Sequence, residues 1–334
     1  MTARTRNPSA EAAATVGPGW KPLVLEPSPP AVLHEPFADD PLAASADDPA
    51  VVSPIERPGS VCLSWAALVE QEPDLIPFAA ERWLAAWPRL KPLPTDFATT
   101  RLGLHRAAAY LVSPARRKAN GKIGLRHTQG GFGTPFFVVP GDDPTCSSQV
   151  RVDGTTLVVQ RGSETTVEPL TTLNQGGELL GFDPDTEWAS GYDIPEPGGL
   201  DDDLGIKPEG AAAVAAWCGF AFSVLEQVRA DVESVEASIP QLWPEHFDPA
   251  IEVGSEQNQQ RASYGLSPGD VEGSQQSPYL YVSVWYPDNL ADDPFWNSET
   301  FPGATLPYEA LLAADDQRTM ALDFFRTGRN LLIG

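Results

Sequence analysis

Three short segments near the C-terminal end decide the fold: residues 248–253 (DPAIEV), 261–266 (RASYGL) and 279–285 (YLYVSVW). In each, apolar or aromatic side chains alternate with others, which is typical of a strand with one buried face. The turn-forming run Ser267, Pro268, Gly269 and Asp270 follows the second segment. Short strands joined by tight turns predict an antiparallel meander here.

A similar set of signals lies earlier in the chain. Residues 122–127 alternate, residues 135–139 are an apolar run, and residues 149–152 and 156–160 flank the dipeptide Asp153-Gly154. This dipeptide between two strand-like segments is typical of a tight hairpin. The first half therefore predicts a second meander.

Helical patterns surround both meanders. We expect helices over 100–112, where Ser113-Pro114 would interrupt or restart the helix, over 170–180, and over 316–332. The longest runs from Gly210 to about Ala237, with apolar side chains three to four residues apart, at Val214, Trp217, Ala221, Leu225, Val228, Val232 and Val235. The sequence predicts an α+β fold of antiparallel β-meanders with helices packed on one face. The repeated helix–meander–helix order suggests two similar units and an internal duplication.

The composition divides the chain into four parts. Residues 1–58 hold 11 prolines and little periodicity, so we expect a disordered arm. Short helices are expected over 64–71 and 77–87. A first α+β unit over 59–182, an acidic linker over 183–208 and a second unit over 209–334 follow, forming one compact body.

The overall charge bears on the class of partner. The formal net charge is -24, which disfavours nucleic acid and anionic membranes as partners. We find no apolar run of about 20 residues and no signal peptide, and expect a cytoplasmic protein. Three distant cysteines, Cys62, Cys146 and Cys218, argue against a disulfide framework and against a thiolate metal cluster.

The charge is also unevenly distributed. Seven of the 22 basic residues lie between Arg101 and Arg126, and residues 183–209 hold nine acidic residues against Lys207 alone. One interpretation is a solvated acidic linker and a basic helix end. The alternative is that the basic segment docks on acidic surface of the same chain or binds an anionic ligand.

The candidate site residues lie in the two meanders. His246 and Asp248, with Glu245 beside them, would share one strand face and suit acid–base chemistry or metal binding. Tyr279 and Tyr281 share a face of a neighbouring strand and suit a small-molecule pocket. Arg126 and His127 occupy the equivalent place in the first meander and would close the site. Each group also has an ordinary structural interpretation, in turns or in the core. We predict no metal site and no cofactor, since the metal-ligand spacings of known motifs are absent.

Residues of about 100–332 resemble a mainly actinobacterial family related to a conserved domain of unknown function. The matching motifs include Gly121–His127, Gly130–Pro135, Leu170–Leu173, Trp243–Asp248, Ser267–Asp270, Pro278–Tyr281 and Leu306–Ala310. The resemblance implies one coherent body and no particular activity.

Two hypotheses for the function follow. The first is a soluble small-molecule-binding or interaction protein with an aromatic pocket, whose partner is a small-molecule ligand or a protein. The second is an enzyme that uses His246 and Asp248, with His127, as acid–base or metal-binding residues. The absence of a known catalytic motif favours the first.

Overall fold

The computed structural model describes residues 89–333, except residues 129, 140, 142–147, 162–163, 189–193, 271–275 and 291. The expected arm over 1–58, the helices over 64–71 and 77–87, and Cys62 and Cys146 lie outside the described residues. Those predictions stay predictions.

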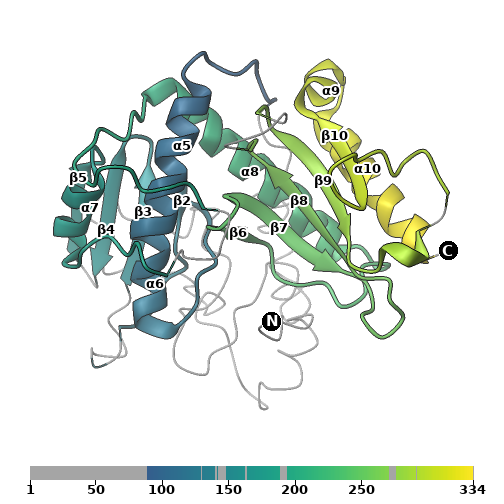
Figure 1. Cartoon of the computed structure of the whole chain (residues 1–334), viewed down its shortest axis with the longest axis horizontal. Helices are drawn as coiled ribbons and strands as arrows, with labels where there is room; N and C mark the ends of the chain where they lie inside the picture. Colours follow the sequence, from purple (N-terminus) through teal and green to yellow (C-terminus); the bar gives the residue numbers. More distant parts are fainter. Residues whose placement is uncertain are drawn as a thin grey trace, which may run out of the picture.

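The described strands form two five-stranded antiparallel sheets, each a simple meander (Figure 1). The first sheet contains β1 (Arg126–Thr128), β2 (Gly131–Gly133), β3 (Ser148–Asp153), β4 (Thr156–Arg161) and β5 (Glu164–Pro169). The second contains β6 (Gln241–Trp243), β7 (Asp248–Val253), β8 (Ala262–Ser267), β9 (Tyr279–Val284) and β10 (Gly303–Pro307). The predicted α+β fold with antiparallel meanders is confirmed, and the two sheets fit a two-unit arrangement.

The predicted hairpin joins β3 to β4. Asp153 pairs with Thr156, so the connecting loop is Gly154 and Thr155. Gly154 has a φ of 59°, a conformation that glycine adopts without steric cost.

The helices are α5 (Phe97–Ala107), the π-helix η4 (Ala108–Val112), α6 (Ser113–Asn120), α7 (Leu173–Leu180), α8 (Pro208–Ala230), the short η5 (Pro287–Asn289), α9 (Tyr308–Ala313) and α10 (Gln317–Ile333). In Figure 1, α5 and α6 lie over the first sheet, and α8 runs diagonally to the back of the second. Buried residues of α8 belong to both hydrophobic cores, since Val214 and Phe222 pack with the first sheet and Trp217 and Leu225 with the second. α8 is therefore the element shared by the two halves.

The sheets meet at their edges. Leu125, just before β1, and Leu242 in β6 exchange two backbone hydrogen bonds of 2.8 Å each. This bridge brings the first strand of each meander side by side.

The helix over the first sheet changes type at Ser113-Pro114. The sequence predicted that this dipeptide interrupts or restarts the helix, and α6 begins at Ser113, directly after η4, so that the helical run continues to Asn120. Proline has no N–H, so Pro114 cannot donate the usual helical hydrogen bond to a carbonyl one turn earlier. Other donors replace it: the Asp185 backbone N–H donates to the Tyr110 carbonyl at 3.0 Å, and the Trp188 indole donates to the Ala109 carbonyl at 2.9 Å.

The end of α8 also differs from the prediction. We expected the helix to reach Ala237, but it ends at Ala230, and Val232 is 94% exposed. Asp231, just past the end, binds Arg326 and Arg329 of α10, which turns the chain away.

The apolar character of α8 was underestimated. By length and composition alone, the helix over Pro208–Arg229 could cross a membrane, since its most apolar stretch has a mean hydropathy of 1.5. We expected no such stretch, but residues 210–225 hold no charged side chain. However, 72% of that stretch is buried inside the protein. Such burial is what a core helix of a folded protein shows.

Candidate functional site

The second sheet has one apolar face and one polar face. Ile251, Leu280 and Val282 point towards α8 and α10 and are buried in the core. The alternating positions place Asp248 on β7, and Tyr279 and Tyr281 on β9, on the opposite face. The candidate site is on this polar face.

Asp248 and Tyr281 meet across the strand between them. The Tyr281 hydroxyl donates a hydrogen bond to Oδ2 of Asp248. Gly265 of β8 pairs with Tyr281 on one side and with Ala250 of β7 on the other. A Cβ atom at Gly265 would lie 2.3 Å from Cζ of Tyr281, so the ring can cross the strand only because this residue has no side chain.

Two further groups extend this arrangement. The Tyr279 hydroxyl donates to Oδ1 of Asp270 at 3.0 Å. The ring centroids of Tyr279 and Tyr281 are 6.2 Å apart, and those of Tyr281 and Phe301 are 6.3 Å apart. We call Asp248, Asp270, Tyr279, Tyr281 and Phe301 the carboxylate–phenol cluster. Sequence reasoning placed Asp270 in a turn and missed its role, because the sequence shows no link between that turn and Tyr279.

Burial dominates the electrostatics of the cluster. Burial raises the pKa of Asp248, and the charge of His246 and the Tyr281 hydrogen bond oppose this only in part. Burial, followed by the charge of Asp248, raises the pKa of Tyr281 well above its ordinary value. Oδ1 of Asp248 is buried and accepts no hydrogen bond from another described residue. A buried oxygen of this kind is an unused acceptor.

His246 lies in the turn between β6 and β7 and is exposed to solvent. A histidine in α5 holds this turn: Nε2 of His105 donates to the Pro244 carbonyl at 2.9 Å, and its ring stacks on Phe247 at 5.3 Å. Phe247 has a φ of 56°, an uncommon conformation for a non-glycine residue. Burial lowers the pKa of His105 to about 3, so it is a neutral core residue.

A buried arginine in α5 fixes the loop that carries Asp270. Arg101 donates to the carbonyls of Pro268, Asp270 and Gln276 at 3.3, 2.9 and 3.2 Å. Gly269 makes this possible, since it has a φ of 101° and a Cβ atom there would lie 2.2 Å from the Gln276 carbonyl oxygen. α5 therefore positions part of the cluster on the second sheet.

Arg126 and His127 belong to a different group. They lie on β1 against α8, where the His127 and Phe222 ring centroids are 6.5 Å apart. Burial lowers the pKa of His127 to about 3, and the charge of Arg126 opposes the effect of burial on the pKa of Glu226 in α8. Glu245 is buried in the same turn as His246. The expectation that β1 closes the site around His246 and Tyr279 stays a prediction.

The basic segment pairs with the acidic connection of the same chain. Arg117 and Lys118 both form ion pairs with Asp185, and Nε of Arg106 donates to the Glu196 carbonyl at 2.8 Å. This supports the interpretation that the basic segment docks on acidic surface of its own chain. In the described part of the chain, no group of three or more His, Cys, Asp or Glu residues could hold a metal ion.

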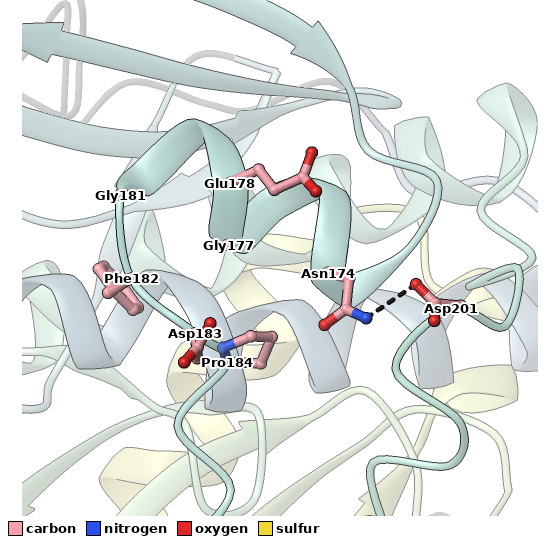
Figure 2. Close-up of a pocket in the computed structure, with 8 residues that line it drawn as sticks. All are labelled: Asn174, Gly177, Glu178, Gly181, Phe182, Asp183, Pro184 and Asp201. Carbon is pink, nitrogen blue, oxygen red and sulfur yellow. Dashed lines mark hydrogen bonds between the residues drawn. The ribbon is translucent and has the colours of Figure 1, made fainter.

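Two cavities lie elsewhere, around the end of α7. The larger has a volume of about 520 Å³ and is lined by Asn174, Gly177, Glu178, Gly181, Phe182, Asp183, Pro184 and Asp201. Figure 2 shows its carboxylates coming from α7, from the chain just after it and from the acidic connection, with Asn174 donating to Asp201 at 2.8 Å. The smaller, of about 200 Å³, lies between α6 and the first sheet.

Comparisons with protein-family models, with curated proteins and with solved structures found no match. The resemblance described above therefore stays an expectation, and the function must be argued from the site itself.

Proposed function

We propose that this protein binds a small organic cation, an ammonium or guanidinium compound, at the carboxylate–phenol cluster. The observation that carries the proposal is Oδ1 of Asp248, which is buried and has no hydrogen-bond partner among the other described residues. It is buried on β7 beside aromatic rings, and on the same sheet face Tyr279 and Tyr281 of β9 are partly exposed. A donor from the ligand would satisfy this oxygen.

The surrounding groups suit a positive ligand. Tyr279, Tyr281 and Phe301 are partly exposed, and the faces of such rings attract cations. The net charge of -24 draws cations towards the protein over a longer range. The ligand would contact the phenol rings and place its N–H groups next to Asp248.

The state of Asp248 makes the binding depend on pH. Burial raises the pKa of Asp248, which favours the protonated, neutral carboxyl in the free protein. A bound cation favours the ionised form, so protons and ligand compete. The affinity for cations should rise as pH increases through the pKa of Asp248.

Isothermal titration calorimetry tests this proposal with phenethylammonium and butylguanidinium as probes and phenethyl alcohol as the neutral analogue. We expect the cations to bind and the alcohol to bind at least tenfold more weakly. Asp248→Asn should weaken the binding of the cations about tenfold or more, which is a loss of about 1.4 kcal/mol of binding free energy. Asp288→Asn, which removes the same charge from an exposed position, is the matched control and should leave binding unchanged. Equal binding of the cations and the alcohol, or equal effects of the two variants, would contradict the proposal.

One observation favours a catalytic alternative. A carboxyl with a raised pKa next to a solvent-exposed histidine is a common arrangement for acid–base chemistry, and His246 lies close enough to Asp248 to influence its pKa.

A further inference from the structure

We propose that the smaller cavity, between α6 and the first sheet, binds a small aryl or short-chain alkyl carboxylate. This site lies on the other half of the protein from the carboxylate–phenol cluster, and the argument for it does not depend on the proposed function.

The apolar part of the cavity follows from the strand register and the helix. Val150 of β3 and Val159 of β4 pair directly and form part of the wall. Ala115 and Ala119 lie four residues apart on the same side of α6 and contribute only methyl groups. These small side chains leave a space that larger ones would fill.

The volume limits the ligand. The cavity measures about 200 Å³. An engineered apolar cavity of about 150 Å³ is large enough to bind benzene. The space therefore suits one aromatic ring with a short substituent, or an alkyl chain of similar bulk, and excludes long acyl chains.

Two cations also line the cavity. Lys118 and Arg161 line the cavity and are both exposed. Arg161 donates to the Leu180 carbonyl at 3.1 Å, which holds the guanidinium beside the apolar wall and uses one of its five N–H donors. Nζ of Lys118 lies 5.1 Å from the Phe182 ring centroid and 3.7 Å from Oδ2 of Asp185. Because Lys118 already pairs with Asp185, Arg161 is the cation that would bind an anionic head group on an apolar body.

The test uses phenylacetate and hexanoate as probes, with benzyl alcohol and benzylammonium as neutral and cationic analogues, followed by calorimetry and ligand-observed NMR on the full chain. We expect the carboxylates to bind at least tenfold more tightly than either analogue. Arg161→Gln should weaken carboxylate binding about tenfold or more. Lys122→Gln, at an exposed position of the same basic segment that does not line the cavity, should have no effect.

A second variant tests the cavity itself. Ala119→Phe should fill the space and abolish binding while the unfolding transition stays cooperative. If that variant fails to fold, the exposed Arg161→Gln decides the outcome alone. Failure of carboxylates to bind at about 10 mM, equal binding of benzyl alcohol, or equal weakening by Arg161→Gln and Lys122→Gln would overturn the proposal. Because the probes carry the opposite charge to those for Asp248, failure here leaves the proposed function intact.

Discussion

The contact between Asp248 and Tyr281 depends on a residue that has no side chain. Gly265 lies beneath the Tyr281 ring, and a methyl group there would overlap Cζ. The geometry of the cluster therefore rests on the absence of a side chain in β8.

Gly265→Ala should destabilise the protein by roughly 1–3 kcal/mol, because the added methyl forces the Tyr281 ring off the strand. Denaturant unfolding measures this cost. In a Tyr281→Ala background the same substitution should cost much less, since the ring is gone. An equal cost in both backgrounds would show that the clash involves something else.

His105 gives the protein a specific sensitivity to acid. Burial lowers its folded-state pKa to about 3 from 6.5, so the stability it contributes is present above pH 6.5 and is lost as pH falls towards 3. His105→Gln should reduce the slope of unfolding free energy against pH by about 1.4 kcal/mol per pH unit in that window. Chemical denaturation at several pH values measures the slope. An unchanged slope would mean that His105 is protonated in the folded protein.

The site could be predicted from sequence only in part. Alternation placed Tyr279 and Tyr281 on one face of their strand and Asp248 on one face of another, but whether those faces coincide depends on the strand register, which the sequence does not show. Asp270 and Arg101 were not foreseen as site residues. Asp270 acts through a hydrogen bond to Tyr279, and Arg101 lies on a helix from the other half of the chain. No local sequence pattern predicts either contact.

At the level of the elements, ion pairs link the end of α8 to α10. Asp231 accepts two hydrogen bonds of 2.8 Å from Arg326 and one of 3.0 Å from Arg329, whose side chain is buried. Burial raises the pKa of Asp231, but the arginines outweigh this and the net shift is downwards. These ion pairs therefore hold the chain at the end of α8, although the apolar spacing continues beyond this point in the sequence.

Asp231→Ala should cost roughly 2–4 kcal/mol of unfolding free energy, because it leaves the buried Arg329 without its main partner. Glu233→Ala is the matched control: Glu233 pairs with the same arginine at 3.6 Å but is 63% exposed. An exposed pair of this kind contributes under about 1 kcal/mol. Similar losses in the two variants would refute the assignment of Asp231 as the anchor.

Trp217→Ala tests the packing of α8 itself. Trp217 is 1% exposed, and its indole donates to the Leu266 carbonyl at 3.2 Å. We expect a loss of about 3–5 kcal/mol, while Val232→Ala, beyond the helix end, should change stability by less than about 0.5 kcal/mol. A loss below about 1 kcal/mol for Trp217→Ala would show that α8 packs against something weaker than a core.

Some elements with strong patterns were predicted well, and some with weak patterns were missed. The apolar run over 135–139 contains only an isolated bridge at Phe137, and β2 lies before it, at Gly131–Gly133. The bounds of β7 match the prediction, as does the β3–β4 hairpin, because apolar alternation and a turn dipeptide agree there. β5 was missed since its residues are mostly polar and exposed, and β6 since it has only three residues. The true end of α8 depends on an ion pair with α10, so no local signal could reveal it.

At the scale of the whole molecule, two meanders of five strands share one helix and meet at one bridge. The Leu125–Leu242 pair links the sheet edges, and α8 contributes to both cores. The two sheets fit the expected two-unit arrangement, and the internal duplication stays a prediction. The shared helix and the bridge also explain how α5 of the first half can position the Asp270 loop of the second.

The central claim is that Asp248 binds a cation in its ionised form, and proton release tests it most directly. Phenethylammonium is titrated in two buffers of different ionisation enthalpy, at pH values from about 5 to about 8. For the native chain we predict net release of protons at the acidic end, falling to zero as pH rises past the pKa of Asp248. Asp248→Asn should release none and bind more weakly. Cation binding without proton release at any pH, or with equal affinity in Asp248→Asn, would contradict the account.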